Sequence, residues 1–255
     1  LLAYPLRDPS PEVKLLAAQT LKFLCSLPAY ESGLVHYATA IAREAFPLLR
    51  HRLSKVRVAG IELLQAAVMV PHREKCKGAG SEAILDLVGF REENVLPVGA
   101  FYDSTQGASH NYLAAIVQDS NVSVRRALAG MLEVWMTELP DRFDFFSRLL
   151  PYALDLFSDE QEAIRETAIR TIQACGQEYE RDHLEEVREK RQYGVDGDAR
   201  MLQGSASWTL PPPFQGRPAL GQRLFVRGHA GRFIKPLLHE LTNWISETRV
   251  QSARL

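Results

Sequence analysis

The chain has 255 residues, 46% of them apolar, and its 30 basic and 31 acidic side chains give a formal net charge of −1. This balance provides no overall field that would attract nucleic acid, and no apolar run approaches the about 20 residues that cross a bilayer. Cys25, Cys76 and Cys175 are odd in number, widely spaced and free of any CxxC pair, so they predict neither a disulfide framework nor a zinc site. A reducing compartment, the cytosol or nucleus, is expected.

A short pattern recurs along the chain: an aspartate, four variable residues, a β-branched residue and then a base. The full copies are Asp8, Val13, Lys14; Asp119, Val124, Arg125; and Asp159, Ile164, Arg165. Looser copies are His51, Val56, Arg57 and Asn243, Thr248, Arg249. The bases are 43, 68, 40 and 84 residues apart, which indicates a period of about 40 with one insertion and one double step. Such a period, with two helices per unit, is typical of HEAT and armadillo solenoids.

The pattern also predicts how the units are joined. The aspartate is expected in the turn between the two helices, where a short carboxylate can cap the second helix. The base, one turn into that helix, is expected to reach the aspartate of the next unit. We therefore predict a structural ladder between repeats rather than a ligand site, and its residues are Asp8, Lys14, Arg57, Asp119, Arg125, Asp159, Arg165 and Arg249. A proline is expected to bend the first helix of each unit, at Pro5, Pro47, Pro151 and Pro236.

In the first half, a helix is expected at residues 11–27, after the end of an earlier one. Its apolar stripe is predicted to be Val13, Leu16, Ala17, Leu21 and Leu24. A full pair follows at 36–50 and 55–70. Residues 71–110 are expected to interrupt the period as an insertion with one short helix at 81–90.

In the second half, a helix at 122–138 is predicted to bury Val124, Leu128, Met131, Leu132 and Trp135. The next pair is expected at 143–157 and 160–177, with a charged, solvated helical extension to residue 193. Residues 194–218 lack helical periodicity and predict a disordered or functional loop. The last pair is expected at 220–241 and from 246 onward.

The fold expected from these elements is an all-α, HEAT/armadillo-like, right-handed solenoid. It is predicted to be a single segment, 1–255, of four to five helix pairs, with insertions at about 71–110 and 177–218. Because neither end carries a polar capping repeat, the chain is expected to be a fragment of a longer one. We expect a monomer.

No pattern of an active site is found in the sequence. Its glycines form neither GxxxxGK nor a GxGxxG after a strand, no strand pattern is present, and no GxSxG elbow occurs. His72 and Cys76 could share a helix face as metal ligands, but with no second pair a flexible loop is the preferred interpretation. No catalytic, cofactor-binding or metal-ligating residue is predicted, and no cofactor.

A basic stretch without acids, residues 199–239, is the candidate partner-binding region. Its residues of interest are Arg217, Arg223, Arg227, Arg232, Trp208 and Phe214. One interpretation is an RNA-binding patch with the two aromatic rings as stacking platforms. The preferred one is that the eight carboxylates of residues 178–198 pair with it locally. The triple proline before Phe214 fits either a polyproline II ligand or a rigid spacer.

Three segments resemble a known family. They are 141–165 (DRFDFFSRLLPYALDLFSDEQEAIR), 217–253 (RPALGQRLFVRGHAGRFIKPLLHELTNWISETRVQSA) and, more weakly, 51–58 (HRLSKVRV). They resemble, in the same order, the HEAT-repeat dynein axonemal assembly factors, fifth of the assembly-factor series. The insertions at 71–110 and 194–216 look longer than is usual in the family, so a distant relative of algal or protist origin is expected.

The resemblance implies a cytoplasmic scaffold, without enzymatic activity, for the preassembly of axonemal dynein arms. Its implied partners are dynein chains, other assembly factors and chaperone machinery, with no membrane and no nucleic acid. The family brings no catalytic residues to carry over. Two alternatives stay open: a general HEAT scaffold of the transport-receptor or phosphatase type, which should lack the 217–253 segment, and an RNA-binding solenoid, which needs the basic stretch exposed and unpaired.

Overall fold

The computed structural model describes residues 4–72, 75–88, 111–192, 214, 216–234 and 238. Over these residues it is helical apart from one short hairpin, which confirms the predicted all-α repeat fold. The elements are, in chain order, η1 (Tyr4–Arg7), α1 (Pro11–Cys25), η2 (Pro28–Tyr30), α2 (Glu31–Leu34), α3 (Ala38–Leu49), α4 (Ser54–Met69), β1 (Pro71–His72), β2 (Lys77–Gly78), α5 (Ala83–Val88), α7 (Tyr112–Val117), α8 (Val122–Thr137), η4 (Arg142–Asp144), α9 (Phe146–Asp155), η5 (Leu156–Ser158), α10 (Glu162–Asp182), α11 (Leu184–Gln192) and α13 (Leu220–Ala230).

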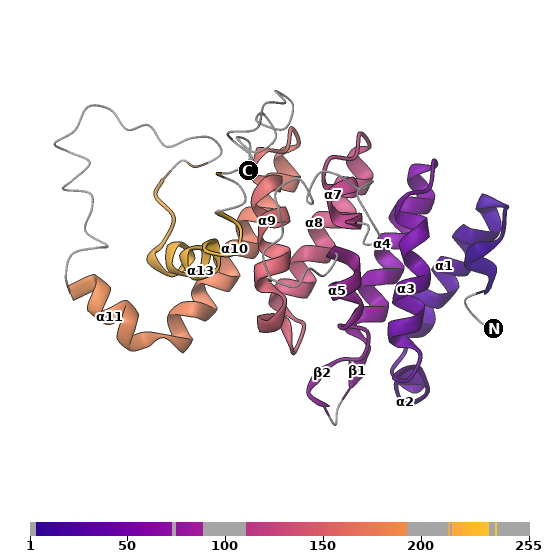
Figure 1. The fold of residues 1–255 in the computed structure, drawn as a ribbon, viewed down its shortest axis with the longest axis horizontal. Helices are drawn as coiled ribbons and strands as arrows, with labels where there is room; N and C mark the ends of the chain where they lie inside the picture. The colour runs from indigo at the N-terminus through magenta and orange to yellow at the C-terminus, as the bar shows by residue number, and fades with distance from the viewer. Residues whose placement is uncertain are drawn as a thin grey trace.

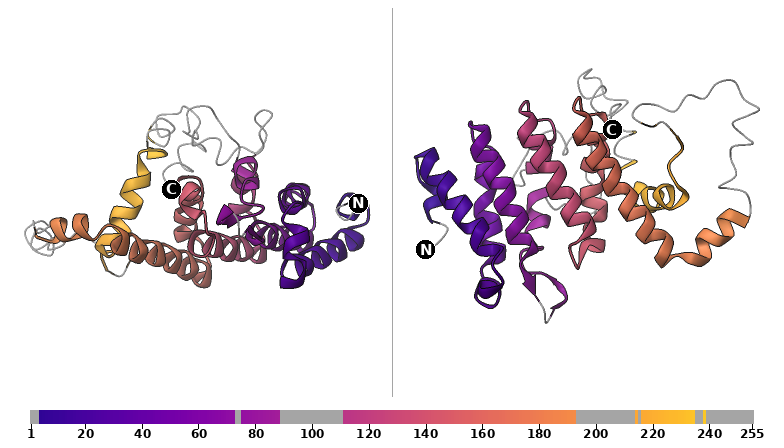
Figure 2. Two further views of the ribbon diagram at one scale, coloured as in Figure 1. Left: turned by 90° about the horizontal axis from the view of Figure 1, so that it is seen from below. Right: turned by 180° about the vertical axis from the view of Figure 1, so that it is seen from behind.

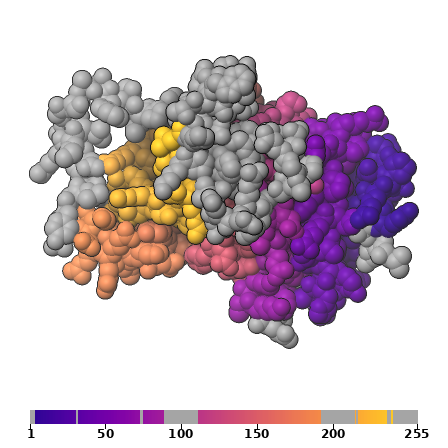
Figure 3. All heavy atoms as spheres, in the orientation of Figure 1, coloured from indigo at the N-terminus to yellow at the C-terminus, as the bar shows by residue number. Residues whose placement is uncertain are grey.

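The helices stand in two rows along the long axis of the molecule (Figure 1, Figure 2). One row holds η1, α3, α5 with α7, and α9; the other holds α1, α4, α8 and α10, each packed against the next. Successive pairs follow one another from the N-terminal end to α11 and α13 (Figure 3). Within the described residues this gives four pairs, with α13 packed beside α9 and α10.

The core lies between the two rows and is best seen at α8. The five apolar residues predicted for its buried stripe, Val124 to Trp135, are at most 1% exposed, which confirms that prediction. Burying a side chain of this size stabilises the fold by about 1.5 to 3 kcal/mol. The Trp135 indole N–H has no hydrogen-bond acceptor among the described residues, so its stabilising effect comes from packing alone.

The stripe predicted for the first long helix is confirmed at Leu21, with Ala17 and Leu24 half-buried against the core, and is wrong at Val13 and Leu16. In α1, Ala18, Leu21 and Cys25 are buried, whereas Val13 is 39% and Leu16 is 67% exposed. The buried residues lie three and four positions apart, on the face that packs against α4. Leu16 lies two residues from Ala18 and so points to the other side of the helix.

The third pair is built around the predicted insertion. Its first helix is in two pieces, since α5 and α7 both pack against α3 and against each other, with residues 89–110 between them. Before α5 comes a hairpin in which β1 and β2 pair antiparallel, Pro71 opposite Gly78. The expectation of no strand is therefore corrected, because two residues on each side are too short to give an alternating pattern.

The hairpin is held tightly against its neighbours. A Cβ at Gly78 would lie 2.3 Å from the carbonyl oxygen of Val68 at the end of α4, so only glycine fits there. Asp141, just before η4, accepts hydrogen bonds from the Gly78 N–H at 3.1 Å and from the Ser81 hydroxyl at 2.6 Å. The described part of the insertion is thus a packed link between the second, third and fourth pairs.

At the C-terminal end, the helical extension expected to residue 193 is present as the end of α10, at Asp182, and the short helix α11. The helix α13 crosses α10 where Gly221 meets Gly176, whose carbonyl oxygen would lie 2.2 Å from a Cβ on Gly221. Val187 of α11 closes a small apolar cluster with Leu220 and Leu224. α13 ends at Ala230, earlier than the predicted 241. Most of the loop predicted at 194–218 lies outside the described residues, as do the helix predicted from 246 onward and Pro236. Of the other predicted prolines, Pro47 lies inside α3, Pro151 inside α9 and Pro5 in η1.

Candidate interaction surface

Two rungs of charged side chains join successive repeats along the α4, α8, α10 row. In the first rung, Nη2 of Arg57 donates a hydrogen bond to Oδ1 of Asp119 at 2.9 Å. Nε of Arg57 lies 2.6 Å from Oδ2 of Asp119, but its N–H does not point at that oxygen. Asp159 accepts two bonds from Arg125, at 2.6 Å from Nε and 3.2 Å from Nη2. The four side chains are only 4–14% exposed. The forked contact between Arg125 and Asp159 fixes the orientation of both side chains.

Each arginine also binds its own repeat. Nη1 of Arg57, Arg125 and Arg165 donates to the backbone carbonyl six positions earlier, at 2.7 Å in all three. One guanidinium therefore joins its own inter-helix turn to the carboxylate of the next repeat. This double contact gives a physical reason for the six-residue spacing in the sequence.

The aspartate position organises the turn in every unit. Its side chain accepts the N–H of the residue two positions on: Asp8 from Ser10 at 2.7 Å, His51 from Leu53 at 3.1 Å, Asp119 from Asn121 at 2.8 Å and Asp159 from Gln161 at 2.8 Å. The donors are the N-cap residues of the second helices, so the prediction that the aspartate itself caps is wrong. The carboxylate acts two residues before the cap, as in an Asx turn.

The ladder changes at its ends. In the second unit His51 stands at the aspartate position, and Lys14 forms no salt bridge with a described residue. Burial and then the positive charge of Lys14 lower the pKa of the His51 imidazole. Arg165 donates to the carbonyls of Asp159 and Glu160, at 2.7 and 3.0 Å. Arg249 lies outside the described residues.

A second tier of ion pairs runs along the same row. Lys22 of α1 binds Glu62 of α4 at 2.9 Å, and Arg170 of α10 binds Glu133 of α8 at 2.6 Å. Lys22 and Glu133 each lie eight positions after the base of their own repeat, Lys14 and Arg125. Their partners, Glu62 and Arg170, each lie five positions after the base of the next repeat, Arg57 and Arg165. Between α4 and α8 these positions hold Gln65 and Gly130, which form no such pair.

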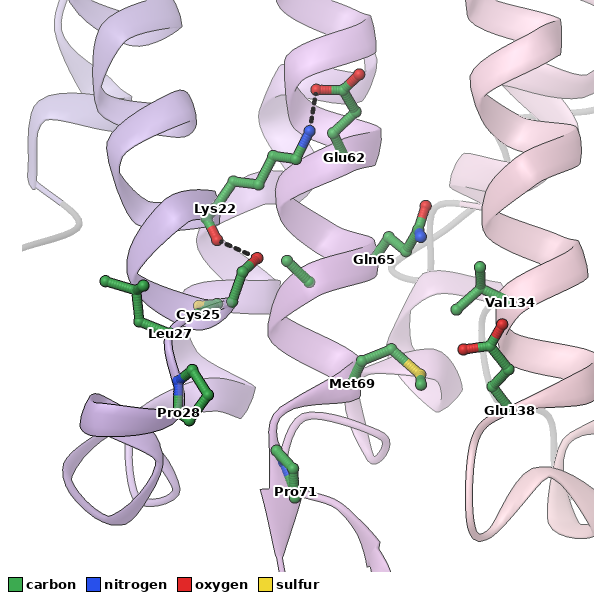
Figure 4. A pocket seen from close by; sticks show the side chains of 12 residues that line it. Lys22, Cys25, Leu27, Pro28, Glu62, Gln65, Met69, Pro71, Val134 and Glu138 are labelled. Atoms are coloured by element: carbon green, nitrogen blue, oxygen red, sulfur yellow. Dashed lines mark hydrogen bonds and ion pairs between the residues drawn. The ribbon is translucent and has the colours of Figure 1, made fainter.

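A groove of about 510 Å³ opens near this missing pair, across α1, α4 and α8 (Figure 4). Gln65 and Met69 of α4 point toward Val134 and Glu138 of α8, while Lys22 and its partner close one end. The remaining lining residues are Cys25, Ser26, Leu27, Pro28, Ala66 and Pro71. A Cβ on Gly130 would meet nothing within 4 Å, so no packing inside the chain requires a glycine at this helical position. Sequence reasoning missed this groove.

The candidate basic residues are partly engaged in the fold. Arg223 donates to the carbonyl of Pro218 at 3.1 Å, and Arg232 donates to the hydroxyl of Ser147 at 2.8 Å. Arg217 and Arg227 are exposed.

One of the two aromatic candidates, Phe214, lies within the described residues. Phe214 is half-buried, with its ring edge-on to Phe157 at 5.5 Å between centroids, so it packs against the fourth pair. Trp208 lies outside the described residues. A stacking platform made of both rings therefore stays a prediction.

Three glutamates of the acidic stretch have partners in the described structure. Their partners are Arg142 for Glu178, Arg191 and the Gly221 N–H for Glu180, and the Tyr179 hydroxyl for Glu186. These contacts hold α10 to η4, α11 and α13. These described glutamates thus help to close the end of the solenoid, and the pairing of the whole acidic stretch with the four arginines stays a prediction, because Asp196 and Asp198 lie outside the described residues.

His72 and Cys76 lie on the hairpin and its turn, so the premise that they share a helix face is wrong. Cys76 has a φ of 48°. In the part of the chain that the structure describes, no group of three or more His, Cys, Asp or Glu side chains is arranged to hold a metal. None of the described helices is both long and apolar enough to cross a membrane.

Comparison with known proteins identifies the relatives of this chain. The family described as "Dynein axonemal assembly factor 5-like, TPR repeats" matches residues 102–190. Dynein axonemal assembly factor 5 from Homo sapiens is 30% identical over 147 residues, and the proteins of the same name from Xenopus laevis and Mus musculus are 26% and 27% identical. Over part of its length the chain is similar to dynein axonemal assembly factor 5.

The relationship to dynein axonemal assembly factor 5 covers part of each protein. The matches span 57% of this chain and 16% of each relative. TPR units, like HEAT units, are helix pairs. An engineered protein of known structure is 14% identical to this chain, and the match covers 99% of this chain and 92% of that one. Its TM-score of 0.49 is too low to support any conclusion about the fold. The resemblance in the sequence is thus confirmed at the level of distant kinship.

Proposed function

We propose that this chain is part of a cytoplasmic scaffold for the preassembly of axonemal dynein arms, and that it has no catalytic activity. The observation that carries the proposal is the similarity to dynein axonemal assembly factor 5 from three vertebrates. The proposed partners are dynein chains, other assembly factors and chaperone machinery. The segment is proposed to act as a monomeric, right-handed solenoid within a longer chain.

The physical character of the described surface supports a scaffold. A solenoid exposes long rows of helices, which suit the holding of large, partly assembled chains. The charged rungs are proposed to be structural, because each joins one repeat to the next and is largely buried. Clients are then expected on the exposed surface between and around these rungs.

The test is genetic replacement in the ciliated or flagellated organism that carries this chain. Without the gene, we expect dynein arms to be missing from otherwise normal microtubule doublets, and dynein heavy chains to be scarce in cytoplasmic extract. Reintroducing the intact gene should restore both, whereas a copy without residues 111–192 should restore neither. Normal arms and normal heavy-chain levels in the deletion strain would contradict the dynein assignment.

The two alternatives are separated by binding measurements. A general scaffold would leave dynein levels unchanged in the deletion strain. An RNA-binding solenoid would bind single-stranded RNA with an affinity that falls steeply as salt rises, because phosphate contacts release counterions. The contacts of Arg223 and Arg232 inside the fold weigh against this RNA interpretation.

A further inference from the structure

The groove of Figure 4 lies where three helices of one row end. α1 ends at Cys25, α4 at Met69 and α8 at Thr137, and residues at or next to each of these ends line the groove. The last carbonyl groups of a helix carry partial negative charge and favour a cation nearby. The groove is therefore electrostatically suited to a positive group.

At two of the three helix ends, the chain has no basic side chain in the last turn that could interact with the terminal carbonyl groups. α1 has Lys22 in its last turn, but this ammonium is paired with Glu62. α4 and α8 have no basic residue in their last turns. Glu138, which follows α8 and lines the groove, is exposed and forms no salt bridge with a described residue. An unmatched carboxylate thus adds to the two helix ends.

The rest of the groove is apolar or open. Met69, Ala66, Val134 and Leu27 contribute half-buried aliphatic surface. One helical turn before Val134, Gly130 has no side chain in the middle of α8, and a Cβ on it would meet nothing within 4 Å. Glycine is unfavourable in a helix interior relative to alanine, and it lets another backbone approach closely.

We propose that this groove binds a segment of a partner protein that combines an aliphatic side chain with a lysine or arginine. The aliphatic group packs between Met69 and Val134, and the cation lies against Glu138 and the C-terminal ends of α4 and α8. Charge complementarity selects a basic segment over an acidic one. The inference deepens the scaffold function proposed above and rests on it only for the identity of the clients.

The test uses a displayed library of random peptides selected on the whole chain. We expect the enriched peptides to share a lysine or arginine next to an aliphatic residue. A labelled consensus peptide is then titrated by fluorescence anisotropy against the wild-type chain and its variants. Glu138→Lys should weaken binding at least about tenfold, a change of about 1.4 kcal/mol. Glu189→Lys, the matched charge reversal on exposed α11, should leave binding unchanged.

Two further variants examine the apolar part of the groove. Gly130→Arg places a long side chain in the open space and should abolish binding. Val134→Glu should do the same, and thermal melting of each variant shows whether the fold is kept. Since Gly130 meets no neighbour, Gly130→Arg tests the groove even if Val134→Glu proves unstable.

Three results would overturn the proposal. They are a consensus without a base, equal binding by the Glu138→Lys and Glu189→Lys variants, and concentration-dependent dimerisation in sedimentation that Glu138→Lys abolishes. The last would mean that a second copy covers the groove. No dynein chain takes part in the peptide assay, so a negative peptide result would not contradict the proposed role in dynein assembly. Normal dynein arms in the deletion strain would likewise not contradict the binding of basic peptides in the groove.

Discussion

The joint between the first and second pairs and the joint between the third and fourth pairs use the same turn with different chemistry. His51 and Asp159 occupy equivalent positions, and each accepts an N–H from the residue two positions on. Only Asp159 also receives the base of the preceding repeat, since Arg125 forks onto it while Lys14 has no carboxylate to meet. The residue at the aspartate position can therefore shape the turn without also joining its repeat to the preceding one.

The largest effect should come from breaking a complete rung. Asp159→Ala leaves the Arg125 guanidinium buried without its partner, and we expect a loss of about 3 to 5 kcal/mol in the free energy of unfolding. Asp8→Ala removes only a turn hydrogen bond, so its loss should be about 1 kcal/mol. Urea denaturation of both variants measures the difference. Equal losses would show that the rung adds nothing to the turn.

A double substitution tests whether the Arg125–Asp159 rung stabilises the fold or mainly specifies how the repeats are arranged. Buried ion pairs can often be replaced by apolar side chains at little cost. Asp159→Leu combined with Arg125→Met should therefore recover at least about 2 kcal/mol of the loss caused by Asp159→Ala. If the double variant is as unstable as Asp159→Ala, the bond from Arg125 to its own turn carries most of the stability.

The second tier offers a smaller gain. Gly130→Ala should stabilise α8 by up to about 1 kcal/mol, because the helix interior disfavours glycine and a Cβ there meets no neighbour. The change is measured by urea denaturation. Gly176→Ala is the control, and it should destabilise because its Cβ would lie 2.6 Å from the backbone of Gln222.

Completing the first rung should give the next smaller gain. His51→Asp supplies the carboxylate that Lys14 lacks and keeps an acceptor for the Leu53 N–H. Because a lysine offers no fork and the pair would be partly exposed, we expect about 0.2 to 1 kcal/mol. His51→Asn, which keeps the acceptor without the charge, should give no gain.

The same position predicts a modest dependence on pH. The pKa of His51 is lowered by burial and by the positive charges of Lys14, Arg52 and Arg57. Below its ordinary value of about 6.5 the unfolded chain therefore binds more protons than the folded one, and stability falls as pH falls through that range. His229, whose pKa is lowered by burial and Arg232, acts in the same direction. The decline should be shallower in His51→Asn than in the wild type, and identical slopes would contradict the role of His51.

The ladder could be predicted from the sequence because its chemistry is local. A guanidinium that reaches the carbonyl six residues back must keep that spacing in every copy, so the spacing is visible without a structure. The buried stripe of α1 could not be predicted in the same way. Leu16 and Leu21 are equally apolar, and only the position of α4 decides which of them is covered.

The groove and the third pair escaped prediction for a similar reason. A first helix made of α5 and α7, separated by residues 89–110, resembles an insertion when it is followed along the chain. The groove needs the ends of three helices. The sequence did contain one sign of the groove. At the positions where the other joints have the ion pairs Lys22–Glu62 and Glu133–Arg170, the joint between α4 and α8 has Gln65 and Gly130. Recognising it required the offsets that the paired side chains reveal.

The joint at His51 also bears on how the molecule opens. In repeat proteins stability is close to a sum of unit and nearest-neighbour terms, so a joint with a weak neighbour term lets its terminal unit open alone. Backbone amides of α1 should then exchange with solvent through a local opening, while those of α8 and α10 should exchange only when the rows separate together. The first pair, which the Lys22–Glu62 ion pair joins to the second without a buried rung, would thereby open more readily than the remainder.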